Sequence, residues 1–197
     1  MIAVIDNGGA NTASLLSALG RLSVEARVTH DHAAIRKASH VILPGVGAAA
    51  DSMTRLRMSG LDVLIPTLTQ PLLGICLGMQ LLFESSEEGP SPCLGLLPGT
   101  VTRLKSSAGV RVPHSGWNRV RWRQTHPLTA GLDERNSWFY YMHSYAVVDS
   151  TAALGATEAG ATFTAVVARG NVAGVQFHPE RSGMAGARIL ENFLEMQ

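Results

Sequence analysis

The sequence has few of the features that mark disulfide-bonded, membrane-spanning or nucleic-acid-binding proteins. Its 197 residues include only two cysteines, Cys76 and Cys93, which are too few for a disulfide framework and favour a reducing, cytoplasmic location. No apolar run approaches the roughly 20 residues that a transmembrane helix needs, and residues 1–6 lack the basic start of a secretory signal. A formal net charge of +1 gives no reason to expect nucleic acid or a membrane as a partner.

The first half of the chain alternates short apolar runs with helical patterns. The apolar runs predict strands, at residues 2–5, 25–29, 41–43 and 71–75. The periodic segments predict helices, at residues 11–22, around residues 53–57 and at residues 77–83. This alternation indicates a largely parallel sheet with helices on both faces, whose ligands bind beyond the carboxyl ends of the strands.

The second half has a different character. A polar loop at residues 84–92 is followed by short strands with turn residues between them, predicted at residues 101–104, 119–123, 138–142, 145–148, 153–156, 162–168 and 172–177. A last helix is predicted at residues 183–196. We therefore predict a single three-layer α/β domain over residues 1–197. Its largely parallel central sheet is flanked by helices, and its added second half is antiparallel.

The most informative segment is GICLG at residues 74–78, which places Cys76 between two glycines. An apolar run precedes it and a helical pattern follows, which is the pattern of a nucleophile elbow. The glycines remove side chains that would collide at a sharp turn. The N–H groups at the start of the helix favour a thiolate over a thiol. A buried apolar cysteine is the alternative, and we favour the nucleophile.

A cysteine nucleophile needs a base, and one of the seven histidines suits that role. In VQFHPE, at residues 175–180, His178 follows a predicted strand and Glu180 comes two residues later. We expect an extended backbone here, which would put both side chains on one side of the chain. Glu180 would then orient the ring of His178 toward the thiol.

Acyl transfer also needs donors for an oxyanion. The segment PGVG at residues 44–47 ends a predicted strand at the same edge of the sheet, and its glycines let backbone N–H groups turn toward the site. We expect one donor from Val46 and another from the N–H of Leu77, directly after the nucleophile.

Three other patterns have simpler interpretations. His30-Asp31-His32 has two metal-ligand types but no third ligand nearby, so we predict a solvated loop and no metal. Arg119, Arg121 and Arg123 alternate with apolar residues, which is typical of a solvated strand face. Residues 7–11 lack the spacing of either common phosphate loop and predict a turn at the active edge of the sheet.

These motifs together resemble a known family. GICLGMQ at residues 74–80 and GVQFHPE at residues 174–180 resemble the nucleophile and His–Glu motifs of class I (triad) glutamine amidotransferases. Within that group, PGVG, PHSGWN at residues 113–118, YMHSY at residues 141–145 and the C-terminal segment resemble the glutaminase subunits of imidazole glycerol phosphate synthases. The resemblance covers essentially the whole chain.

The resemblance implies hydrolysis of glutamine through a Cys76–His178–Glu180 triad, with no cofactor. It implies an oxyanion hole at Val46 and Leu77, and glutamine binding by a set of pocket residues, namely Gly45, Gly47, Gln80, His143, Ser144 and Tyr145. Ammonia would pass to a separate (β/α)₈ cyclase subunit in a heterodimer. The residues expected at that interface are Asn11, Trp117, Asn118 and Tyr140. The free chain is expected to be nearly inactive without this partner.

Two alternatives stay open at this point. The triad would be the same in glutaminase subunits of the pyridoxal phosphate, anthranilate or purine systems, although the blocks at residues 114–118 and 143–145 favour the histidine pathway. A binding subunit that has lost catalysis is the other, and the intact triad argues against it. Cys93 and the basic stretch at residues 103–123 have no assigned role.

Overall fold

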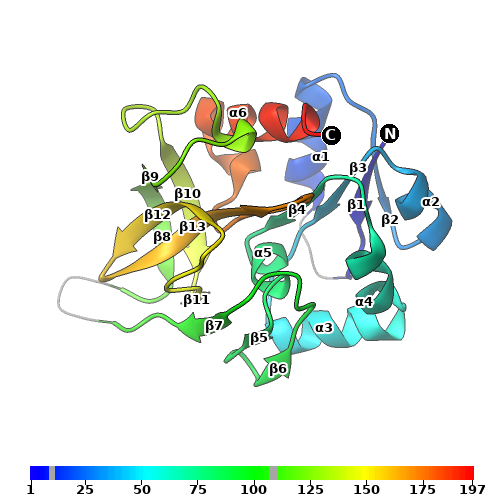
Figure 1. Cartoon of the computed structure of the whole chain (residues 1–197), viewed down its shortest axis with the longest axis horizontal. Helices are drawn as coiled ribbons and strands as arrows, with labels where there is room; N and C mark the ends of the chain where they lie inside the picture. Colours follow the sequence, from blue (N-terminus) through cyan, green and yellow to red (C-terminus); the bar gives the residue numbers. More distant parts are fainter. Residues whose placement is uncertain (9–11, 107–110) are drawn as a thin grey trace.

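The computed structural model describes residues 1–8, 12–106 and 111–197. The strands of its main sheet are β1 (Ile2–Ile5), β2 (Ala26–Thr29), β3 (His40–Leu43), β4 (Leu72–Ile75), β9 (Arg121–Trp122), β12 (Ala153–Ala159), β13 (Ala161–Arg169) and β14 (Val172–Val175). Their order across the sheet is β2-β1-β3-β4-β14-β13-β12-β9 (Figure 1). From β2 to β14 neighbouring strands run parallel, and from β14 to β9 they run antiparallel.

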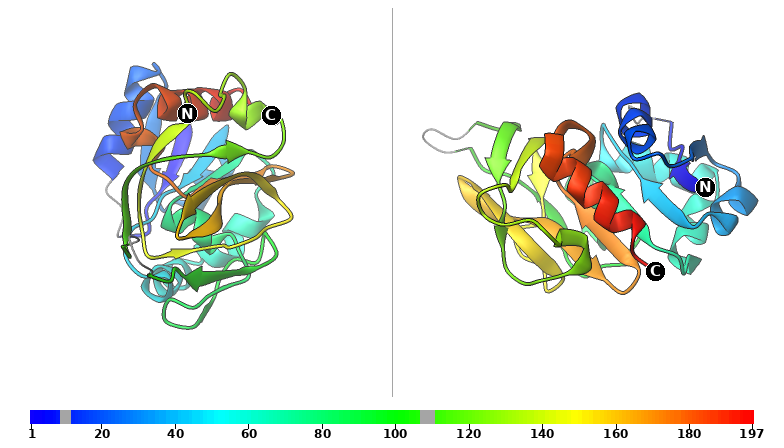
Figure 2. Two further views of the ribbon diagram at one scale, coloured as in Figure 1. Left: turned by 90° about the vertical axis from the view of Figure 1, so that its left-hand side faces the viewer. Right: turned by 90° about the horizontal axis from the view of Figure 1, so that it is seen from above.

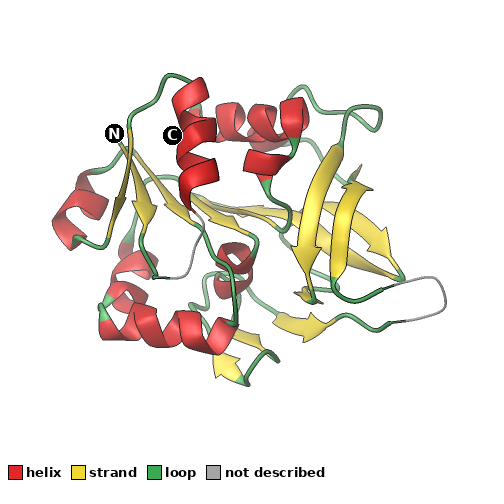
Figure 3. Ribbon diagram, turned by 180° about the vertical axis from the view of Figure 1, so that it is seen from behind, coloured by secondary structure: helices red, strands yellow, loops and turns green. Residues whose placement is uncertain are grey.

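Helices cover both faces of the sheet (Figure 3). One face carries α1 (Thr12–Arg21) and α6 (Gly183–Leu194). The other carries α2 (His32–Lys37), α3 (Ala49–Met58), α4 (Leu61–Leu64) and α5 (Leu77–Leu81). Successive side chains of a strand point to opposite faces. In β1, Ile2 and Val4 therefore join the core under α1, whereas Ala3 and Ile5 join the core under α3.

The position of β14 decides where the site forms. This strand comes from the C-terminal part of the chain but lies parallel to β4, with Gly174 opposite Gly74 and Val175 opposite Ile75. A side chain at Gly174 would meet the Met79 side chain of α5 at 2.7 Å. The chain therefore leaves both strands at the same edge, directly before Cys76 and before residues 176–180.

The remaining strands form two small sheets. β8 (His114–Arg119) pairs with β10 (Trp138–His143) in an antiparallel ribbon, at the end of the molecule away from β2 (Figures 1 and 2). The second sheet has the order β11 (Tyr145–Ala146), β7 (Thr100–Arg103), β5 (Ser85–Ser86) and β6 (Ser91–Pro92). Three 3₁₀ turns complete the description, η1 (Ile65–Thr67), η2 (Pro127–Thr129) and η3 (Pro179–Arg181).

The predicted fold class is confirmed, and several local predictions are wrong. The predicted loop at residues 84–92 contains β5 and β6. The single strand predicted at residues 119–123 is divided between β8, which pairs with β10, and β9, which pairs with β12 in the main sheet. Residues 30–32 are not simply a loop: the Asp31 carboxylate accepts the N–H of Ala34 at 2.6 Å and caps α2.

The described residues contain no helix that is both long and apolar enough to cross a membrane.

Candidate active site

Cys76 lies at a strained turn between β4 and α5. Its φ of 54° and ψ of −110° are unusual for a residue with a side chain, and such strain costs about 1–3 kcal/mol where the surrounding structure maintains it. Both flanking glycines are needed for packing. A Cβ at Gly78 would lie 1.8 Å from the carbonyl oxygen of Leu43, and one at Gly74 would lie 2.7 Å from the backbone of Met79. The predicted elbow is therefore present.

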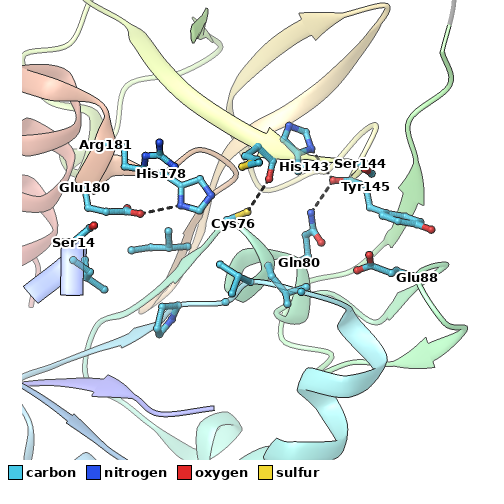
Figure 4. Close-up of a pocket in the computed structure, with 18 residues that line it drawn as sticks. Ser14, Cys76, Gln80, Glu88, His143, Ser144, Tyr145, His178, Glu180 and Arg181 are labelled. Carbon is cyan, nitrogen blue, oxygen red and sulfur yellow. Dashed lines mark hydrogen bonds and ion pairs between the residues drawn. The ribbon is translucent and has the colours of Figure 1, made fainter. Parts of the chain in front are cut away.

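His178 and Glu180 form a buried pair next to this elbow. Nδ1 of His178 lies 2.9 Å from Oε1 of Glu180. The extended backbone predicted here is present at His178 but not beyond it, because η3 begins at Pro179. The fixed φ of proline suits the first position of a helical turn, and the turn brings Glu180 back toward the ring of His178. Figure 4 shows the ring between the Glu180 carboxylate and the Cys76 sulfur.

The surroundings of His178 favour its charged form. Burial alone would lower its pKa, but contact with Cys76 and Glu180, and the negative charge that each can carry, raise the pKa to about 10. The His178 ring is therefore an imidazolium at neutral pH, beside the Cys76 sulfur and the Glu180 side chain. The ring then holds the proton that a leaving amine requires.

Strand β10 holds the histidine segment in place. The N–H of His178 donates to the carbonyl of Tyr140 at 2.9 Å. The Ser182 hydroxyl accepts the N–H of Tyr140 at 2.9 Å and donates to the carbonyl of His178 at 2.6 Å. The base is thus fixed to the ribbon that also carries three of the expected interface residues, Trp117, Asn118 and Tyr140.

The Cys76 sulfur has two further polar neighbours, which sequence reasoning missed. The thiol donates to the carbonyl of Met142 at 3.8 Å, and Nε2 of Gln176 donates to the sulfur at 3.8 Å. Oε1 of Gln176 accepts from Nε2 of Gln80 at 3.0 Å, and the same nitrogen donates to the carbonyl of Tyr145 at 2.7 Å. The one signal for Gln176 in the sequence is a polar residue in an otherwise apolar run.

A cavity of about 350 Å³ opens over the cysteine (Figure 4). All the residues expected to act in catalysis, oxyanion binding and glutamine binding line it, namely Gly45, Val46, Gly47, Cys76, Leu77, Gln80, His143, Ser144, Tyr145, His178 and Glu180. Polar lining residues that the sequence did not predict are Ser14, Glu88 and Arg181. Glu88 accepts the N–H of Ala49 at 3.0 Å; burial raises its pKa, and this hydrogen bond partly offsets the rise.

The segment PGVG packs directly against the elbow. A Cβ at Gly45 would lie 2.9 Å from the nitrogen of Gly78, and the Asn7 side chain donates to the carbonyl of Pro44 at 3.2 Å. Within the described residues, the N–H groups of Val46 and Leu77 have no hydrogen-bond partner. Both are therefore available to a ligand, and their role in an oxyanion hole stays a prediction.

His143, which lines the pocket, forms a pair with a second histidine, His114. Its Nε2 lies 3.1 Å from Nδ1 of His114, and its Nδ1 lies 2.8 Å from the carbonyl oxygen of Tyr145. Burial lowers the pKa of His114, and it lowers that of His143 to about 3, so both rings are neutral. Among the described residues, no group of three His, Cys, Asp or Glu side chains could hold a metal ion.

Three of the residues expected at the interface lie outside the pocket, on the ribbon. Trp117 is 55% exposed and packs edge-on against Tyr140, over which the Arg181 guanidinium lies at 4.2 Å. Asn118 is directed inward and donates to Nε2 of His114 at 3.1 Å and to the carbonyl of Glu158 at 2.9 Å. The prediction for Asn11 falls outside the described residues.

A cysteine at a strained elbow beside a buried His–Glu pair is the arrangement of enzymes that transfer acyl groups through a thioester. A family model described as "Glutamine amidotransferase class-I" matches residues 3–196, and the chain belongs to that family. Two solved structures share the fold. One, described as a glutamine amidotransferase, has a TM-score of 0.74 at 20% identity, covering 99% of this chain and 98% of that one. The other, described as a putative GMP synthase protein from Thermoplasma acidophilum, has a TM-score of 0.70 at 22% identity, covering 98% and 91%.

Curated relatives indicate which group within this family the chain belongs to. The chain is 54% identical over 195 residues to the imidazole glycerol phosphate synthase subunit HisH of Xanthomonas oryzae pv. oryzae (strain MAFF 311018). The aligned residues cover 99% of this chain and 97% of that protein. It is 51% identical over 197 residues to the subunit HisH 2 of Legionella pneumophila (strain Paris), covering 100% and 98%. Within the amidotransferases, the chain is therefore a member of the HisH subunit group.

Proposed function

We propose that the chain is the glutaminase subunit of an imidazole glycerol phosphate synthase, in histidine biosynthesis. It hydrolyses glutamine to glutamate and ammonia. A (β/α)₈ cyclase subunit uses the ammonia to make imidazole glycerol phosphate and an aminoimidazole carboxamide ribotide. The observation that carries the proposal is Cys76 at a strained elbow beside the His178–Glu180 pair, in a chain 54% identical to a HisH subunit.

The steps of glutamine hydrolysis follow from the proton that the His178 ring holds. The Cys76 thiolate attacks the side-chain amide carbon of glutamine, and a carbon–sulfur bond forms as the carbonyl oxygen becomes an oxyanion. His178 gives its proton to the amide nitrogen, the carbon–nitrogen bond breaks and ammonia leaves a γ-glutamyl thioester. His178 then takes a proton from water, whose oxygen displaces the sulfur to give glutamate. Glu180 keeps the ring oriented throughout.

The pocket supplies the remaining roles. Val46 and Leu77 offer backbone N–H groups to the oxyanion, which counters the charge that develops during attack. Gly45, Gly47, Gln80, His143, Ser144 and Tyr145 shape the space for the substrate. The Glu88 carboxylate, on the opposite side of the cavity from Glu180 (Figure 4), suits the α-ammonium group of glutamine.

The partner and the setting belong to the same proposal. The exposed aromatic face of the ribbon, at Trp117 and Tyr140, docks the cyclase subunit in a heterodimer. Two free thiols, Cys76 and Cys93, suit a cytoplasmic location. One sheet joins strands from both halves of the chain, which supports a single domain over residues 1–197.

The experiment uses the chain assembled with its cyclase partner and the ribonucleotide substrate. Cys76→Ala should abolish product formation from glutamine but retain it when ammonium salts replace glutamine, because only the ammonia source is removed. Cys93→Ala is the matched control and should keep both activities, since Cys93 lies outside the pocket. Continued glutamine-dependent synthesis by Cys76→Ala, or fast glutamine hydrolysis by the chain without its partner, contradicts the proposal.

The relatives also help to choose between the histidine pathway and the alternative functions given in the sequence analysis. The curated relatives reported above are all HisH subunits, at 51–54% identity over nearly the whole chain. This favours the histidine pathway over the pyridoxal phosphate, anthranilate and purine systems. The His178–Glu180 contact at 2.9 Å likewise favours an active subunit over a catalytically silent one.

A further inference from the structure

We propose that Gln176 is a further catalytic residue, whose side-chain N–H stabilises the thiolate of Cys76. The inference rests on the proposed function only in taking Cys76 as the nucleophile. Gln176 follows β14 directly and is fully buried, with 0% of its surface exposed. Its Nε2 donates to the Cys76 sulfur at 3.8 Å, and its Oε1 accepts from Gln80 at 3.0 Å.

The orientation of the Gln176 side-chain amide is fixed, through Gln80, by the backbone carbonyl of Tyr145. The backbone carbonyl of Tyr145 only accepts hydrogen bonds, so the side-chain atom of Gln80 that lies 2.7 Å from it has to be the nitrogen. The same nitrogen faces Gln176 at 3.0 Å, and the facing atom of Gln176 has to be its oxygen. The nitrogen of Gln176 is then left to face the sulfur. Reversing either amide would place two donors or two acceptors together.

The two neutral histidines hold the same carbonyl from the other side. Nδ1 of His143 has to donate to the Tyr145 carbonyl, so its Nε2 accepts from His114, whose Nε2 in turn accepts from Asn118. Every donor in this series meets an acceptor. The carbonyl that orients both glutamines is therefore itself held from the ribbon side, at Asn118.

The orientation matters once Cys76 loses its proton. The Met142 carbonyl accepts from the thiol at 3.8 Å, but a carbonyl oxygen offers nothing favourable to a thiolate. The imidazolium of His178 and the N–H of Gln176 are then two positive groups beside the sulfur. Because a hydrogen bond to a charged group is stronger than one between neutral groups, the N–H of Gln176 favours the reactive form.

The test measures the reactivity of the thiol directly. In a Cys93→Ala background, the rate of Cys76 alkylation by iodoacetamide is followed against pH in the whole chain. Gln176→Met, which keeps length and loses the donor, should move the midpoint of the profile to higher pH by about one unit, a roughly tenfold slower reaction at pH values well below the midpoint. Gln176→Glu should move it further, since a carboxylate repels the thiolate. Gln70→Met is the matched control and should leave the midpoint unchanged, because Gln70 bonds to the carbonyl of Ile35.

A second measurement needs no substitution at Gln176. In ¹⁵N NMR spectra of the wild-type chain, the side-chain amide signals of Gln176 should shift with the same midpoint as Cys76 alkylation. The proposal is wrong if the Gln176 amide signals do not shift as Cys76 ionises. It is also wrong if folded Gln176→Met has the same alkylation midpoint as the Gln70→Met control. Neither measurement involves glutamine, so failure of the glutaminase proposal would appear separately, as glutamine-dependent synthesis by Cys76→Ala.

Discussion

Two buried histidines of this site differ in charge. His178 and His143 are both buried, yet contact with Cys76 and Glu180 outweighs burial and raises the pKa of His178 to about 10, whereas burial lowers the pKa of His143 to about 3. One ring is therefore cationic at neutral pH and the other is neutral. The first suits proton transfer, and the second suits a fixed hydrogen-bond series. The sequence marks His178 by Glu180 two residues later, but Cys76 beside His178 and His114 beside His143 are partners distant in the chain.

A pH titration tests the charged state of His178. Its folded-state pKa is raised above the ordinary value of 6.5 to about 10, so its contribution to stability is complete below about pH 6.5 and is lost as pH rises through about 10. Glu180→Gln removes one cause of the rise. We expect a lower NMR titration midpoint for the His178 ring in the variant.

The unfolding free energy gives an independent measure of the same effect. The advantage of the wild type over Glu180→Gln should shrink as pH rises from about 6.5 toward about 10. His143 serves as the internal reference, since its ring should stay neutral down to about pH 3 in both proteins. An unchanged His178 midpoint in the variant would show that Glu180 does not hold the charge.

At the scale of elements, the elbow depends on how closely two backbones approach. The start of α5 packs against the end of β3 with no room for a methyl group at Gly78. This contact fixes the elbow against the segment PGVG and so sets the distance between the two expected oxyanion donors. The glycine pattern in the sequence indicated a tight turn, but the partner in the close contact, the Leu43 carbonyl, came only from the structure.

Substitution at Gly78 tests that packing. Gly78→Ala would place a Cβ 1.8 Å from the Leu43 oxygen, so we expect a loss of about 3 kcal/mol or more in the free energy of unfolding, with loss of glutamine hydrolysis. Gly20→Ala is the matched control. Gly20 lies in α1 with nothing within 4 Å of an added Cβ, and alanine there should stabilise the chain by about 0.5–1 kcal/mol. Similar unfolding curves for the two variants would contradict this account.

At the scale of the whole molecule, the site and the exposed aromatic face share one strand. β10 bonds to the His178 segment through Tyr140, offers the Met142 carbonyl to Cys76 and pairs along β8 with Trp117. A partner docked on the ribbon would thus contact the strand that positions both nucleophile and base. This arrangement gives a physical route by which the cyclase subunit can control glutamine hydrolysis.

Association with the cyclase subunit tests the docking face. Trp117→Ala should weaken the heterodimer by about tenfold to a hundredfold, because an exposed tryptophan in an aromatic and cationic surface is typical of an interface anchor. Its thermal unfolding should be nearly unchanged. Val63→Ala, at a 70% exposed apolar side chain on α4, is the control and should bind normally. Calorimetric titration measures both, and equal affinities for the two variants would place the interface elsewhere.

The sequence by itself determined the local parts of this protein. Glycine spacing around Cys76, strand–helix alternation and the His-Pro-Glu segment each reflect short-range sterics, which a single sequence displays. The turn at Pro179 shows the limit: the His178–Glu180 contact was expected, but from an extended backbone that the structure replaces with a 3₁₀ turn.

The tertiary structure alone decided what meets at the sulfur. Placing β14 beside β4 brought Gln176 and His178 to Cys76, and the Tyr145 carbonyl then fixed the direction of two buried amides. The hydrogen bonds among these residues join positions 65 to 100 apart in the chain. Hydrogen bonds act over a few ångströms in space, so only the folded chain could show which partners each polar group has.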